Sequence, residues 1–235
     1  MKKLLLILFA STLLITNCIS ITYVDKKKIV DIYPKDAGSW NLDDCNKILE
    51  FYSASNSTNR IFTTGPINQK VYIKAILLNK TSIKAMARKE VIEKRLDDKE
   101  FYSILDTYLK EFTSLSFDKS RGEIIEVDPN YSKGYTFKIY FENISDPYQP
   151  IFLEDGYSYF FLENMNGEFS RVTEVMGLFV EDYFQLDGYL DAIIIFSPFS
   201  STGKRLFEEN NLNESYKLVF NGLQKEPISV QWNLN

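Results

Sequence analysis

Two short motifs bring together side chains that could do chemistry. Ser201 and Lys204 have the S-x-x-K spacing by which a lysine on the next helical turn could deprotonate a serine. Oxygen ligands beside a glycine turn suit Ca2+, and four acids surround Gly188, namely Glu181, Asp182, Asp187 and Asp191. The serine lacks the companion S-D-N and K-T-G motifs, and the acids lack the EF-hand spacing. We therefore predict no catalytic residue, no cofactor and no metal site.

The chain contains no histidine, which removes several classes of enzyme. Imidazole is the base of Ser-His-Asp and Cys-His sites and a ligand of HExxH zinc and non-haem iron sites. A phosphate loop also fails, because Pro198 stands where the first glycine should be and Arg205 follows Lys204. A carboxylate-dependent glycan hydrolase stays open, since it needs two acids across a cleft and the chain has 32 Asp and Glu residues.

The first residues have the layout of a secretory signal peptide. Lys2 and Lys3 precede an apolar run over residues 4–15, shorter than the roughly 20 apolar residues of a transmembrane helix. The run ends in Leu14-Ile15-Thr16-Asn17-Cys18. This segment resembles the lipobox of bacterial lipoproteins in a relaxed, spirochaete-like form, with Asn17 in place of the usual small residue.

The resemblance implies an address for the protein. Residues 1–17 would be removed, and Cys18 would carry diacylglycerol and a fatty acyl chain such as palmitate, which anchors the chain to a membrane of the cell envelope. We expect the outer membrane, on its periplasmic or its outer face. The alternative is an ordinary cleaved signal peptide in which the cysteine occurs by chance.

Charge and cysteine content limit the partners. Removal of residues 1–17 takes away two lysines and no acid, so the net charge changes from −5 to −7. An acidic body without an Arg/Lys cluster among aromatic residues argues against nucleic acid. The expected partners are the membrane, through the lipid, and an unidentified envelope or host protein. Cys45 would have no intramolecular partner, and we interpret it as a buried small hydrophobe rather than a thiol that pairs between molecules.

The first half of the chain predicts a tether followed by helices. Residues 18–40 are expected to be the tether, and residues 41–235 a single globular domain. A helix with Asn41 or Asp43 as its cap is expected from Leu42, followed by a polar loop over 53–59 and a core strand over 71–78. Two further helices make up a segment of about residues 81–112, capped by Thr81 or Ser82 and by a capping box at Asp97 and Glu100. Their apolar stripes should pack on one side of a sheet.

From Glu123 onward the apolar residues alternate with a period of two, which predicts strands. Asn166-Gly167 indicates a type I′ hairpin. The remaining strands are expected over residues 135–141, 151–153, 157–163, 168–175, 190–196, 216–220 and 228–234.

The composition and strand pattern favour a mainly β fold with a helical insertion. The strand Phe137-x-Ile139-x-Phe141-x-Asn143, followed by Pro150-Ile151-x-Leu153 and an alternation ending in Trp232, resembles an immunoglobulin-like antiparallel β-sandwich of a kind common in bacterial lipoproteins. The alternative is an α+β fold with helices across one face of a single antiparallel sheet. For function we predict a non-enzymatic binding or structural module, with a glycan hydrolase or a surface-exposed adhesin as alternatives.

Overall fold

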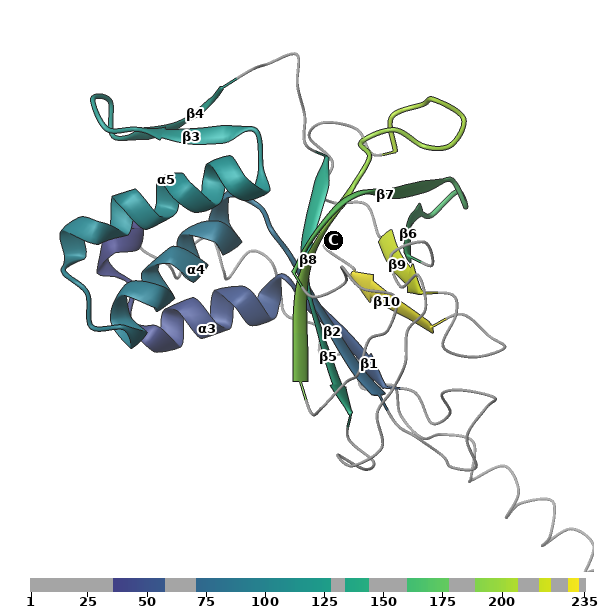
Figure 1. The fold of residues 1–235 in the computed structure, drawn as a ribbon, viewed down its shortest axis with the longest axis horizontal. Coiled ribbons are helices and arrows are strands. Elements are labelled where there is room, and N and C mark those ends of the chain that lie inside the picture. Colours follow the sequence, from purple (N-terminus) through teal and green to yellow (C-terminus); the bar gives the residue numbers. More distant parts are fainter. Residues whose placement is uncertain are drawn as a thin grey trace, which may run out of the picture.

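The protein is mainly β with helices, as the sequence predicts (Figure 1). The computed structural model describes residues 36–57, 71–127, 134–143, 160–177, 189–206, 216–220 and 228–232. The helices are α3 (Leu42–Phe51), α4 (Lys80–Glu93) and α5 (Phe101–Phe112). The strands are β1 (Ser53–Ser57), β2 (Val71–Leu77), β3 (Leu115–Asp118), β4 (Glu123–Glu126), β5 (Tyr135–Asn143), β6 (Phe160–Asn164), β7 (Phe169–Gly177), β8 (Tyr189–Phe196), β9 (Tyr216–Phe220) and β10 (Ile228–Trp232).

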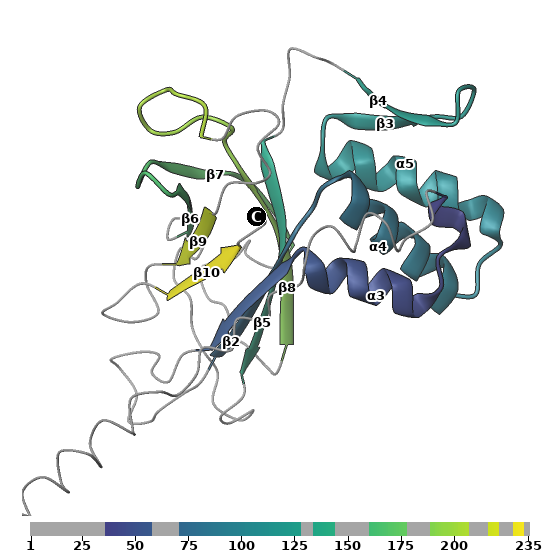
Figure 2. The ribbon, with the colours of Figure 1, turned by 180° about the vertical axis from the view of Figure 1, so that it is seen from behind.

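Eight of these strands form one antiparallel sheet in the order β1-β2-β5-β8-β7-β6-β9-β10. The sheet curls until its two edge strands, β1 and β10, lie side by side (Figure 1). Figure 2 shows the sheet and the helices from behind. Two side chains bridge these edges: Asn56 Nδ2 donates to the carbonyl oxygen of Ser229 at 2.8 Å, and Trp232 Nε1 donates to that of Tyr52 at 3.0 Å. The result is a nearly closed barrel, while β3 and β4 form a separate two-stranded ribbon.

Each face of the curled sheet has its own hydrophobic core, because successive side chains of a strand point to opposite faces. The inner face carries a core rich in aromatic residues, including Ile73, Phe137, Ile139, Phe196 and Trp232. The outer face is covered by helices α3, α4 and α5, which contact Ile76, Met176 and Ile193. The helices therefore lie on one side of the sheet, as expected.

The helix ends follow from capping. Asn41 caps α3 with a reciprocal box, because its side chain accepts from Asp44 N while the Asp44 carboxylate accepts from Asn41 N. α4 is capped by Asn79 rather than by the predicted Thr81 or Ser82, and the Ser82 hydroxyl instead closes the reciprocal box. Asp97 caps a 3-10 turn, Asp98–Glu100, and α5 begins without a side-chain cap. The predicted capping box at Asp97 and Glu100 is therefore wrong, and α5 depends on its buried stripe.

Two predictions near the amino-terminal side of the domain are wrong for the same reason. Residues 53–57 form β1 rather than a polar loop, because the neighbouring β2 supplies hydrogen-bonding partners along their whole length. Residues 36–40 are not part of the tether, because Ala37 and Trp40 are buried against the helices. Both outcomes depend on contacts with distant segments, which local polarity does not reveal.

The hairpin between β6 and β7 forms where it was expected, although its turn is not type I′. Such a turn needs two residues with positive φ, and of the pair only Gly167 has one, at 77°. The buried side chain of Asn164 organises the turn instead. Its Oδ1 accepts from the backbone N–H groups of Asn166 and Glu168 at 3.0 Å each, and its Nδ2 donates to the Leu206 carbonyl oxygen at 3.1 Å.

The strands over residues 135–143, 189–196, 216–220 and 228–232 match the predicted positions. An immunoglobulin-like sandwich of two sheets is not confirmed, because hydrogen bonds join these strands into one curled sheet. The predicted strand over 151–153, residues 157–159 and the signal region lie outside the described residues.

Gly134 supplies a test of this packing. Its φ is +94°, and a Cβ atom there would lie 1.9 Å from the Phe196 carbonyl oxygen on the neighbouring strand. We expect Gly134→Ala to lower the free energy of unfolding by more than about 3 kcal/mol, because both backbone strain and a clash with backbone oppose it. Urea denaturation measures the loss.

Gly122→Ala is the matched control. Gly122 also has a positive φ, +68°, but nothing lies within 4 Å of its added Cβ. It should lose about 1 kcal/mol from strain alone. Equal losses in the two variants would contradict the close packing of Gly134 on β8.

Candidate functional site

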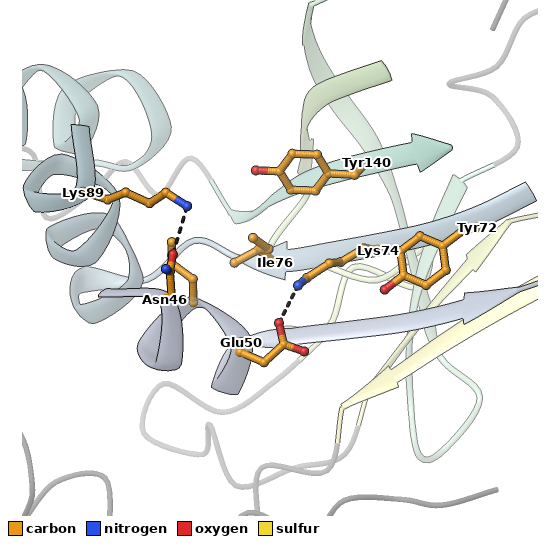
Figure 3. A pocket seen from close by; sticks show the side chains of 8 residues that line it. Asn46, Glu50, Tyr72, Lys74, Ile76, Lys89 and Tyr140 are labelled. Carbon is orange, nitrogen blue, oxygen red and sulfur yellow. Dashed lines mark hydrogen bonds and ion pairs between the residues drawn. The ribbon is translucent and has the colours of Figure 1, made fainter. Parts of the chain in front are cut away.

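A cavity of about 400 Å3 opens on the outer face of the sheet, where the helical layer ends (Figure 3). Four elements line it, since α3 and α4 supply one wall and β2 and β5 supply the floor. The lining residues, here called the outer pocket, are Asn46, Leu49, Glu50, Tyr72, Lys74, Ile76, Lys89 and Tyr140.

The alternation of β2 explains why polar groups reach this pocket. Ile73 and Ala75 point into the inner core, so Lys74 and Ile76 point to the outer face. Ile76 is buried beneath the helices, whereas Lys74, two residues earlier, is partly exposed. In the β2–β5 ladder Lys74 pairs with Tyr140, so the two residues belong to the same row of the sheet. The floor of the pocket thus changes from apolar at Ile76 to polar at Lys74, which is the neighbouring residue on the same face of β2.

Two lysines from different elements reach the outer pocket. Lys74 Nζ lies 2.5 Å from Glu50 Oε2 on α3, and Lys89 Nζ on α4 donates to Asn46 Oδ1 at 2.9 Å. Lys89 Nζ also lies 3.5 Å from a carboxylate oxygen of Glu93, which is outside the lining. Figure 3 shows the Lys74–Glu50 and Lys89–Asn46 contacts, with the rings of Tyr72 and Tyr140 on the sheet side. The lining itself therefore has two cations and one anion.

A second polar cluster supports Tyr140 from beside the pocket. Lys138 Nζ lies 3.0 Å from Asp191 Oδ2 on β8 and 5.2 Å from the centre of the Tyr140 ring. Burial alone lowers the pKa of the Lys138 ammonium group, but Tyr140 and Asp191 outweigh this effect and leave its pKa raised. Lys138 therefore stays charged beside Tyr140 and Asp191.

This arrangement suits polar recognition. Glu50 is the one carboxylate among the lining residues, it is ion-paired, and its side chain is 71% exposed. The described lining therefore lacks the pair of carboxyl groups that glycoside hydrolysis requires. Ammonium groups, an amide and tyrosine rings on helices and strands can instead hold a ligand in one orientation.

The chemistry suggested by sequence motifs does not gather at this pocket. Ser201 and Lys204 are both exposed in the turn that follows β8. Asp191 is paired with Lys138, and no group of acids or cysteines in the described ranges is arranged to hold a metal ion. Cys18 and the other acids around Gly188, namely Glu181, Asp182 and Asp187, lie outside the described residues.

Cys45 is buried in the helical layer, as its interpretation as a small hydrophobe requires. Burial raises the pKa of its thiol to about 11, against a smaller lowering effect of Arg88. The thiol is therefore protonated at neutral pH, and a protonated, enclosed thiol is a poor nucleophile.

Comparisons with known proteins add little to this geometry. No family model and no curated protein matches the chain. A solved structure that does match is described as a novel protein of unknown function from Burkholderia pseudomallei. It has a TM-score of 0.35 and 9% sequence identity, over 74% of this chain and 78% of that chain. A likeness this remote carries no argument about function.

No helix in the described part of the chain combines the length and the apolar character that crossing a membrane requires.

The Lys74–Glu50 pair should matter little for stability. Partly exposed ion pairs contribute about 0–1 kcal/mol, so Lys74→Gln and Glu50→Gln should each change the free energy of unfolding by less than about 1 kcal/mol. Urea denaturation of both variants and the double variant gives the coupling energy. The matched comparison is the exposed ion pair of Lys47 and Asp43, which both lie on α3 with Glu50. A loss above about 2 kcal/mol would assign Lys74 to the fold rather than to a binding site.

Proposed function

We propose that the protein is a lipid-anchored lipoprotein of the cell envelope whose globular domain is a non-enzymatic binding module. The outer pocket is the proposed binding site. The observation that carries this proposal is the composition of its lining, in which two lysines, two tyrosines and an amide from four elements surround one ion-paired carboxylate. Polar groups held on rigid elements are what a recognition site needs.

The lipid anchor is supported by the lipobox-like residues 14–18, in which Cys18 stands at the acylated position. Several acyl chains make anchoring effectively permanent, since each buried CH2 contributes about 0.8 kcal/mol. The described residues begin at Asp36, so residues 19–35 lie in sequence between the domain and the proposed lipidated Cys18. This proposal has two partners. One is the outer membrane, which the lipid enters, and the other is a ligand supplied by the envelope or by a host.

An immunoglobulin-like arrangement of the strands, as in an antiparallel β-sandwich, stays part of the proposal. What supports it is that the two halves of the curled sheet share one inner core, as the layers of a sandwich do. The single hydrogen-bonded sheet favours the alternative of helices on one face of an antiparallel sheet.

Substitution of Cys18 tests the anchor. In Cys18→Ala the protein has no thiol for diacylglycerol, so we expect it to move from the detergent phase to the aqueous phase and to lose radioactive palmitate label. Phase separation of cell extracts in a detergent that clouds on warming gives the partition directly. Cys45→Ala is the control, because Cys45 lies in the helical layer, and it should stay in the detergent phase. Continued membrane retention of Cys18→Ala would contradict lipidation.

A further inference from the structure

We propose that the outer pocket binds a carboxylate-bearing sugar, whose carboxylate replaces that of Glu50 on Lys74. This inference rests on the proposed function and names the ligand class of the same site. It follows from the two lysines, from the exposure of the Glu50 side chain, and from the mixture of polar and apolar residues that line the pocket.

The two lysines provide the recognition of the carboxylate. Lys74 comes from β2 and Lys89 from α4, so the two cations approach the same cavity from the sheet and from the helical layer. Each ammonium group has three N–H donors, and the contact with Glu50 uses one of those on Lys74. Charge-assisted hydrogen bonds from such donors to a carboxylate are about twice as strong as neutral ones. Lys74 pairs with Glu50, and Lys89 lies 3.5 Å from a carboxylate oxygen of Glu93, so a ligand carboxylate competes with protein carboxylates for both ammonium groups.

Glu50 is the internal counter-ion of Lys74. Its side chain is 71% exposed, whereas that of Lys74 is 27% exposed. The carboxylate can therefore swing into solvent at little cost, while the ammonium group stays near the floor of the pocket. A ligand carboxylate must compete with Glu50, and removal of the Glu50 charge should raise affinity for the ligand.

The remaining lining fits a sugar ring better than a small inorganic anion. Leu49, Ile76 and the rings of Tyr72 and Tyr140 provide apolar surface for the C–H groups of a sugar ring (Figure 3). Because Asn46 Oδ1 accepts from Lys89, the amide nitrogen of Asn46 is the group that can donate to a ligand hydroxyl. A cavity of about 400 Å3 also has room beyond a single anionic group.

The experiment is calorimetric titration of the mature, full-length lipoprotein in a detergent without a sugar headgroup. The probes are methyl β-D-glucuronide and methyl β-D-glucoside. They differ only at C6, where the glucuronide has a carboxylate and the glucoside has a hydroxymethyl group. We expect the glucuronide to bind at least about tenfold more tightly. Lys74→Gln and Lys89→Gln should each weaken its binding about tenfold, and Glu50→Gln should strengthen it about threefold.

Two control variants carry the same charge changes outside the pocket. Lys47→Gln and Asp43→Asn lie on the exposed side of α3 and should change the affinity by less than about twofold. Equal binding of the two probes, or a Glu50→Gln variant that binds more weakly, would overturn the proposal. If the glucoside binds and Tyr72→Ala removes that binding, the ligand class is wrong but the binding module stands.

If neither sugar binds, the proposed ligand class is overturned as well. A fragment screen observed by protein NMR then tests the proposed function separately. Fragments that perturb Lys74 and Tyr140 would keep the outer pocket as a binding site. A screen in which no fragment perturbs them would overturn the binding module also.

Discussion

The return of β10 to the side of β1 is the constraint on which the rest of the structure depends. Trp232 joins the two edges, because its indole N–H donates to the Tyr52 carbonyl oxygen. The centre of its ring lies 5.3 Å from that of the Phe137 ring and 5.2 Å from that of the Tyr216 ring. Closure encloses the apolar positions of every second residue on the inner face. The outer positions of the same strands must then be covered by helices or remain in water.

The outer pocket is a consequence of partial covering. The helices bury Ile76, whereas Lys74 and Tyr140 lie in the next row of the same ladder, at the margin of the helical layer. An apolar wall beneath the helices and cations at their edge thus come together without any special loop. Residues on regular elements hold their positions more precisely than residues on loops, which suits selective binding.

The predictable part of the fold is the part in which burial alternates along one strand. Phe137 and Ile139 point inward and Lys138 outward, so the period of β5 is visible in sequence. β1 is not visible, because its serines have no apolar alternation and its pairing is fixed by β2. Trp40 looks like part of a tether until its contacts with the helices are known. The pocket was missed because its residues come from α3, β2, α4 and β5, and the polar outer positions of β2 and β5 were the one available signal.

We propose above that the outer pocket is where this protein recognises its ligand. Amide 1H–15N correlation spectra recorded during titration with methyl β-D-glucuronide test it residue by residue. Binding at the outer pocket should shift the signals of Asn46, Glu50, Tyr72, Lys74 and Lys89 most, because these residues line it from the helices and the sheet. Shifts centred on the β3–β4 ribbon or on the turn after β8, with these residues unchanged, would contradict it.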